Sequence, residues 1–157
     1  MSKLFVTGGA GFIGSNYVRW VLANRDDEVT VFDALTYAGN TDNFRPFEDD
    51  PRFRFVKGDI CDRDAVLEAL AGHDQVVHFA AESHVDRSIV SPDEFVRTNC
   101  GGTNVMCDVA RQVGVELLAV ALPEVRANPE LLHRAIENVV RNALHHSPAG
   151  GVVRIAA

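Results

Sequence analysis

The chain has 157 residues, of which 46% are apolar and 24% are charged, a composition typical of one globular domain with a hydrophobic core. Its formal net charge of −7 argues against a general binding surface for nucleic acid or anionic membranes. No apolar run reaches the length of a membrane span, and three cysteines without a CxxC pair predict reduced thiols in a cytoplasmic protein.

Strand-like and helix-like segments alternate along the chain. Apolar and β-branched runs predict strands over residues 3–7, 29–32, 53–56, 75–79, 115–122 and 152–155. Helical spacing of apolar residues predicts helices over residues 12–23, 62–71, 92–112 and 129–146. The alternation predicts an α/β fold, a doubly wound parallel sheet of the Rossmann type with strand order 3-2-1-4-5 and a sixth strand at its edge. Two glycines at 101 and 102 predict a bend in the third helix, and residues 34–51 are expected to form a loop.

Three glycines follow the first strand at fixed spacing in TGGAGFIG, residues 7–14. Gly8 permits a tight turn, Gly11 lets the backbone approach a diphosphate, and Gly14 lets the helix pack closely on the sheet. The free N–H groups at the start of that helix would then face the phosphates. The pattern predicts a dinucleotide site, and the alternative is that the glycines only make a tight strand–helix turn.

Asp33 ends the second strand, nineteen residues after Gly14. A carboxylate at this place can accept hydrogen bonds from the hydroxyls of the adenosine ribose, and it would repel a 2′-phosphate. The sequence therefore favours NAD over NADP as the cofactor, with a plain surface role for Asp33 as the alternative.

Several longer strings carry a resemblance to a known family. They are DALTYAGN (33–40), GDICD (58–62), HFAAESHVDRSI (78–89) and RTNCGGT (97–103). Together with the glycine turn they resemble the extended short-chain dehydrogenase/reductase family and, within it, the dTDP-glucose 4,6-dehydratases. The resemblance covers about residues 3–116, the N-terminal third of such an enzyme. It implies NAD as cofactor and a nucleotide-sugar substrate.

The resemblance also implies roles for individual positions. It places Asp33 and Thr36 at the adenosine ribose, Asp59 at adenine, and residues 79–83 beneath the nicotinamide half. The full implied set of cofactor-binding residues is Gly8, Gly11, Phe12, Ile13, Gly14, Asp33, Thr36, Asp59, Ile60, Phe79, Ala80, Ala81, Ser83 and Thr98. His78 and His84 are interpreted as structural or surface histidines. No metal site is predicted.

The family's chemistry needs a Tyr-x-x-x-Lys pair, because a neighbouring ammonium favours the phenolate form of a tyrosine base. The two tyrosines, Tyr17 and Tyr37, are followed four residues later by Val21 and Thr41. The acid/base pair for water elimination is missing as well. We therefore predict no catalytic residues in this chain and no dehydratase turnover. The helix near 92–113 is the candidate surface for a homodimer, although its apolar residues could equally belong to the core.

Residues 123–157 resemble a different family, the ATP-binding domain of sensor histidine kinases. Glu137, Asn138 and Asn142 match its asparagine-bearing helix, and the resemblance implies that Asn142 coordinates the magnesium of Mg-ATP. The alternative is that these amides lie on the exposed face of an amphipathic helix. The expected organisation is an NAD-binding domain over residues 1–122, with residues 123–157 packed as its last βα unit. A remnant ATP-binding module and a purely structural domain are the alternative functions.

Overall fold

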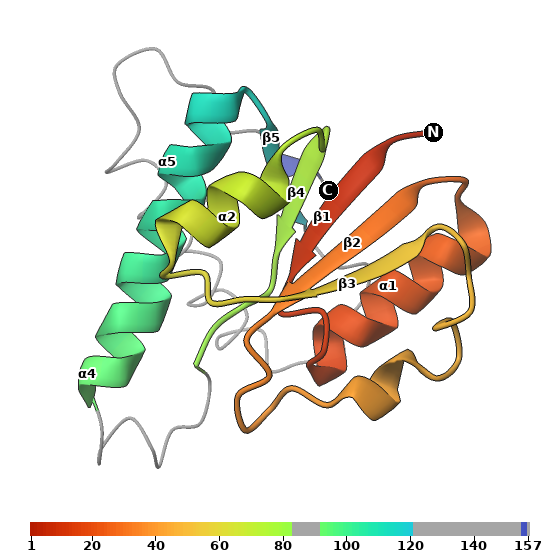
Figure 1. Cartoon of the computed structure of the whole chain (residues 1–157), viewed down its shortest axis with the longest axis horizontal. Helices are drawn as coiled ribbons and strands as arrows, with labels where there is room; N and C mark the ends of the chain where they lie inside the picture. The colour runs from red at the N-terminus through yellow and green to blue at the C-terminus, as the bar shows by residue number, and fades with distance from the viewer. Residues whose placement is uncertain (83–91, 121–154, 157) are drawn as a thin grey trace. The chain divides into compact units, whose positions relative to one another are not determined.

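A computed structural model of the chain describes residues 1–82, 92–120 and 155–156 (Figure 1). The chain divides into two compact units, Met1–Leu117 and Leu118–Ala157. The helix predicted over 129–146, with Asn138 and Asn142, lies outside the described residues. The packing of residues 123–157 as a last βα unit therefore stays a prediction.

The strands are parallel and follow the predicted order β3-β2-β1-β4-β5. Their bounds are Lys3–Thr7 for β1, Glu28–Asp33 for β2, Phe53–Lys57 for β3, Gln75–His78 for β4, Glu116–Val120 for β5 and Ile155–Ala156 for β6. In the second unit, Ala119 and Val120 pair in parallel with β6, so the predicted sixth strand is present as a two-residue strand. The fold class predicted from the alternation is confirmed.

The helices of the described residues agree with the predicted positions, with two differences. Their bounds are Phe12–Asn24 for α1, Arg63–Leu70 for α2, Pro92–Phe95 for α4 and Thr103–Val113 for α5. The expected loop over 34–51 contains a 3-10 turn, η1 (Thr41–Phe44), whose start is capped by the side chain of Asn40. Between α4 and α5 the chain forms a π-helical segment, η2 (Val96–Gly102), where a bend was predicted. Gly102 lets this segment approach the loop after β3, since a Cβ there would lie 2.5 Å from Ile60 Cδ1.

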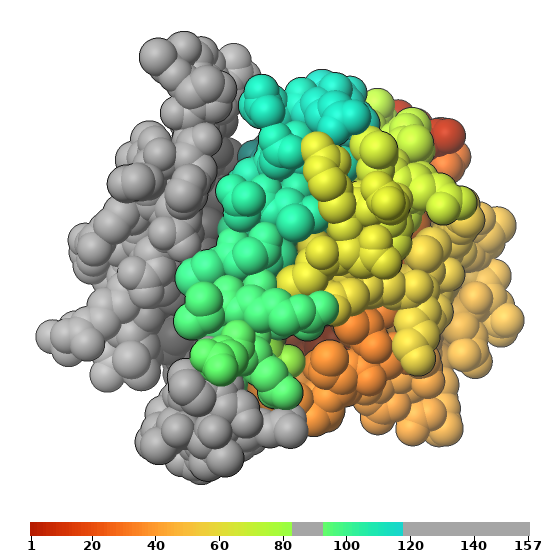
Figure 2. Space-filling model, turned by 60° about the vertical axis from the view of Figure 1, so that its left-hand side comes forward, coloured from red at the N-terminus to blue at the C-terminus, as the bar shows by residue number. Residues whose placement is uncertain are grey.

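The sheet is covered on both faces, because successive side chains of a strand point in opposite directions. Leu4 and Val6 point towards α1, whose Val18 and Val21 are fully buried. Phe5 points to the other face, where α2 and α5 lie side by side (Figure 2). The core cluster on that face consists of Phe5, Phe32, Ile60, Val66, Leu70, Val76, Met106, Val109 and Ala110. The carboxyl ends of the strands are thus left free to carry a site.

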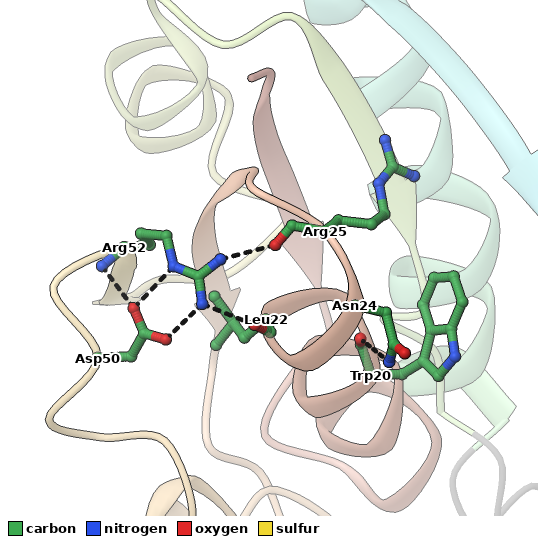
Figure 3. Close-up of polar contacts among 6 residues, drawn as sticks. All are labelled: Trp20, Leu22, Asn24, Arg25, Asp50 and Arg52. Carbon is green, nitrogen blue, oxygen red and sulfur yellow. Dashed lines mark hydrogen bonds and ion pairs between the residues drawn. The ribbon is translucent and has the colours of Figure 1, made fainter.

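An arginine from outside α1 holds the C-terminal end of that helix (Figure 3). Arg52 donates from Nη1 to the carbonyl of Arg25 and from Nη2 to the carbonyl of Leu22, both at 2.6 Å. Asp50 holds the guanidinium in place with an ion pair of 2.7 Å. Because α1 has no basic residue in its last turn, Arg52 supplies both the hydrogen bonds and the positive charge that a helix C-terminus favours.

We predict that Arg52→Ala lowers the unfolding midpoint temperature by roughly 3–6 °C, because two helix carbonyls lose their donors. Circular dichroism during heating measures the shift. Arg54→Ala is the matched control, since Arg54 lies two residues later, in β3, with an exposed side chain. Equal midpoints for the two variants would show that the contact with α1 contributes nothing.

Candidate dinucleotide-binding site

A cavity of about 770 Å³ opens at the carboxyl ends of the strands. Its walls come from the turn after β1, the end of β2 and the loop after it, the loop after β3, the segment after β4, and α4 with η2. In a doubly wound sheet this is the edge where ligands bind. The volume falls within the range of roughly 300–1,000 Å³ typical of small-molecule sites.

The predicted cofactor residues meet in this cavity. All of them line it except Ser83, which lies outside the described residues. Sequence reasoning missed further lining residues, namely Phe32, Ala34, Tyr37, Ala38, Gly39, Gly58, Glu82, Glu94 and Arg97. Most of these fall inside or beside the strings DALTYAGN, GDICD and RTNCGGT, so the signal that could have found them is the continuity of those strings.

The absence of a side chain has a different physical reason at each of the three glycines of the turn. Gly8 has φ +68°, and a Cβ there would lie 2.5 Å from the backbone nitrogen of Ala80. A Cβ on Gly14 would collide with the carbonyl oxygen of Gly8, so the close approach is to the turn itself and not, as predicted, to the sheet. The fold therefore requires glycine at both positions.

Gly11 differs, because the described part of the fold does not require its missing side chain. Its φ of −77° and ψ of 172° suit any residue. A Cβ on it would meet one atom within 4 Å among the described residues, the carbonyl oxygen of Gly8 at 3.4 Å. Gly11 lines the cavity, so the absence of a side chain at this position leaves room for a ligand.

The start of α1 faces the cavity through Gly11, Phe12, Ile13 and Gly14. Among the described residues no side chain caps this helix end, and its first turn has no acid. The first N–H groups of a helix have no intrahelical partner, and they carry the positive end of its dipole. This end of the cavity therefore suits an anionic group.

Asp33 is half-buried and has a fixed orientation. Its Oδ2 accepts the N–H of Ala10 at 2.9 Å and its Oδ1 accepts the N–H of Leu35 at 2.8 Å. Each carboxylate oxygen has a further lone pair, so the group can also accept hydrogen bonds from a diol. Asp33 thus ties the turn after β1 to the loop after β2 and is more than a plain surface residue.

Asp59 is a second carboxylate in the wall. Its Oδ2 is 2.6 Å from Nη2 of Arg97, and its Oδ1 accepts the N–H of Cys61 at 2.9 Å. Burial raises the pKa of Asp59, but the Cys61 amide and the Arg97 guanidinium outweigh it and lower the pKa below its usual value. Burial and the Asp59 charge raise the pKa of the Cys61 thiol, so this cysteine is no thiolate nucleophile at neutral pH.

The family model described as GDP-mannose 4,6 dehydratase matches residues 5–125. The match includes every described wall of the cavity. The chain belongs to this dehydratase family.

Individual relatives agree with the family match. The chain is 54% identical over 113 residues to a dTDP-glucose 4,6-dehydratase of Streptomyces niveus, covering 69% of this chain and 34% of that protein. It is 51% identical over 123 residues to the low-salt glycan biosynthesis protein Agl12 of Haloferax volcanii, covering 78% and 40%. The resemblance to dTDP-glucose 4,6-dehydratases is thus confirmed.

A solved structure is similar as well. It is the dTDP-glucose 4,6-dehydratase DesIV of Streptomyces venezuelae with NAD bound, at 51% identity and a TM-score of 0.72, covering 75% of this chain and 38% of that chain. The chain therefore spans between a third and two fifths of the length of these dehydratases. The family match ends at residue 125, so the kinase-like interpretation of residues 123–157 receives no support from it.

A partly buried histidine at the end of β4 supports the cavity wall of this dehydratase domain. Nδ1 of His78 lies 2.6 Å from Oγ1 of Thr7, and its Nε2 lies 3.2 Å from Oγ1 of Thr103. Thr7 in turn accepts the N–H of Ala80 at 3.3 Å, which is part of the wall. Burial lowers the pKa of His78 to about 4, so the imidazole is neutral at physiological pH. The structural interpretation of His78 agrees with these contacts, and His84 lies outside the described residues.

Asn99 of η2 fixes the wall where it leaves β4. Its Oδ1 accepts the N–H of Glu82 at 2.7 Å, and its Nδ2 donates to the carbonyl of Glu82 at 2.9 Å. These two hydrogen bonds satisfy the backbone N–H and carbonyl of Glu82, as pairing with a neighbouring strand would do within a sheet. No pattern in the sequence predicts this role, because the contact joins residues 17 positions apart.

No helix within residues 1–82, 92–120 and 155–156 is long and apolar enough to cross a bilayer.

We predict that protonation of His78 destabilises the fold as the pH falls from about 6.5 towards 4. Because its folded pKa is lowered from 6.5 to about 4, the unfolded chain binds this proton first, and the free energy of unfolding falls by up to about 3 kcal/mol across that window. Urea unfolding of the parent chain and of His78→Gln, at about pH 7 and about pH 5, measures the difference.

The variant should lose less stability between the two pH values than the parent chain. Burial also lowers the pKa of His73, but both proteins keep that residue, so it cancels in the comparison. The lowered pKa values of the Asp50 and Asp59 carboxyl groups affect stability below about pH 5, and both proteins keep these residues, so they cancel as well. Identical pH dependence in both proteins would contradict the role of His78.

Proposed function

We propose that this chain is the NAD-binding portion of a dTDP-glucose 4,6-dehydratase-like protein. The observation that carries the proposal is the convergence of the glycine turn, Asp33 and Asp59 on one cavity at the carboxyl ends of the strands. The NAD-bound dehydratase with which this chain shares 51% identity supports the same assignment. NAD supplies a hydride acceptor and donor in such proteins.

The residues present fit NAD at three places. The uncapped start of α1 and the bare backbone of Gly11 would hold the diphosphate. Asp33, with its orientation fixed by two backbone amides, would accept the ribose hydroxyls and disfavour a 2′-phosphate. Asp59 and Ile60 would meet adenine, Phe79, Ala80 and Ala81 would lie beneath the nicotinamide half, and Thr98 would complete the cofactor site.

We propose further that this chain does not perform the dehydration by itself. Tyr17 and Tyr37 are its two tyrosines, and neither is followed by a lysine four residues later. Burial raises the pKa of Tyr17, the opposite of what a tyrosine base needs. The substrate of the whole protein, a dTDP-hexose, follows from the relatives alone and stays a proposal.

Two further assignments belong to this proposal. The surface formed by α4, η2 and α5 would support a homodimer, because Val96 has 61% of its surface exposed there. A cytoplasmic location is supported by Cys61, Cys100 and Cys107, which are all free thiols.

The first test of NAD binding is Gly11→Val. The backbone at Gly11 accepts a side chain, and the new side chain would extend into the cavity at the start of α1. We expect roughly 10- to 100-fold weaker binding of NAD by calorimetry, with the unfolding midpoint of the unliganded protein little changed.

Gly101→Ala is the matched control. A Cβ there would lie 4.0 Å from the nearest atom of the described residues, the carbonyl oxygen of Val96, and Gly101 does not line the cavity. Its NAD affinity should equal that of the parent chain. Parent-like affinity in Gly11→Val, or no NAD binding by the parent chain, would refute the proposed function.

The second test concerns turnover. The purified chain, incubated with NAD and dTDP-glucose, should form no 4-keto-6-deoxy sugar, because it carries no Tyr-x-x-x-Lys pair. The alkaline absorbance of the keto sugar, or mass spectrometry, detects product, and an intact dehydratase serves as the positive control. Product formation would show that another residue acts as the base.

A further inference from the structure

The 3-10 turn η1 follows directly after the loop that lines the cavity. Phe44, the last residue of η1, is 4% exposed. Its ring packs against Phe47, Phe53 and Phe55, with ring centroids 5.2–6.0 Å apart. At the other end of η1, Asn40 Oδ1 accepts the N–H of Asp42 at 2.9 Å. Both ends of the turn are thus fixed, so the side chain of Asn43 between them has a defined position.

Asn43 reaches across to the glycine turn, 33 residues earlier in the chain. Its Nδ2 donates to the carbonyl oxygen of Ala10 at 2.8 Å, and the N–H of Asn40 donates to the same oxygen at 3.1 Å. The N–H of Ala10 donates to Asp33 at 2.9 Å. The N–H and the carbonyl of Ala10 are therefore both bonded by groups from the end of β2 and the segment that follows it.

These bonds fix the plane of one peptide group. The carbonyl of Ala10 and the N–H of Gly11 belong to the same planar unit and point in opposite directions. The carbonyl is held by Asn43 and Asn40, and the N–H donates to the carbonyl of Gly8 at 3.2 Å. With both ends held, this peptide cannot rotate, and it sets the direction in which α1 starts.

The loop between Asp33 and Asn40 is constrained by the same contacts. Its beginning is tied to Asp33 through the N–H of Leu35, and its end is tied to Ala10 through Asn40. Leu35 has φ +54°, a left-handed conformation that costs energy for a side chain of this kind. Strain of this sort persists only where surrounding contacts hold it, so the loop and the glycine turn are built as one unit.

We propose that Asn43 is a positioning residue that holds the glycine turn in the conformation that receives the diphosphate of the ligand. The identity of the ligand rests on the proposed NAD binding, but the effect of Asn43 on the turn can be measured without a ligand. Asn43 itself does not line the cavity, so it acts through Ala10 and not by contact with the ligand.

The test compares Asn43→Ala with Asn24→Ala in the full chain. Asn24 is a matched control, since its Nδ2 also donates to a backbone carbonyl at 2.8 Å, that of Trp20 at the far end of α1 (Figure 3). We expect Asn43→Ala to bind NAD and ADP roughly five- to tenfold more weakly, and adenosine with unchanged affinity, because one hydrogen bond that orients the diphosphate site is lost. Asn24→Ala should bind all three like the parent chain.

Asn43→Asp sharpens the test because it keeps the size of the side chain. An aspartate cannot donate, and its charge would face the carbonyl oxygen of Ala10, so binding of ADP should fall further than in Asn43→Ala. Parent-like ADP affinity in this variant, or an equal loss for adenosine and ADP, would overturn the inference.

Amide hydrogen exchange separates this inference from the proposed function. Exchange at Ala10 and Gly11 in the unliganded protein should be at least threefold faster in Asn43→Ala than in Asn24→Ala, since both amides are protected by the held turn. Unchanged exchange would refute the positioning role even if NAD binds. Faster exchange in a chain that does not bind NAD would support the positioning role and refute the proposed function alone.

Discussion

The site depends on the close approach of two backbones, the turn after β1 and the segment after β4. A Cβ at Gly8 would lie 2.5 Å from the nitrogen of Ala80, so no side chain fits between them. The N–H of Phe79 donates to the carbonyl of Thr7 at 3.0 Å, and the neutral imidazole of His78 joins both strands to α5. The floor of the cavity is therefore made of backbone, and what decides its shape is the conformation of the turn.

The cavity has a positive region at the start of α1 and negative groups at the other strand ends. The start of α1 brings the positive end of a helix dipole, while carboxylates come from Asp33 at the end of β2, from Asp59 in the loop after β3, and from Glu82 and Glu94. Asp59 is neutralised by Arg97, whereas Asp33 is held by backbone amides, which carry no net charge. A ligand with an anionic centre and hydroxyl groups beside it matches this arrangement, and a dinucleotide has both.

Sequence reasoning predicted the parts of the fold that depend on local pattern. The strands and the order of the sheet follow from periodicity and from residue types that favour strands, and the structure confirms them. The cavity residues followed from motif strings of a known family, and all of the described ones lie together. The π-helical segment η2 was predicted only as a bend, because glycine indicates a weak point in a helix but not the geometry that replaces it.

Sequence reasoning failed for contacts between side chains and distant backbone. Arg52 at the end of α1, Asn99 beside Glu82 and Asn43 beside Ala10 each satisfy a backbone group 17 to 33 positions away. Such contacts leave no periodic signal in the sequence. A single polar residue in a loop could pair with many backbone groups, so the sequence does not indicate which one it contacts. They matter at this site because a turn rich in glycine has few side chains of its own to restrain it. The bonds that hold it must therefore come from other elements, and η1, anchored by Phe44, supplies one of them from a segment whose composition indicated nothing more than a loop.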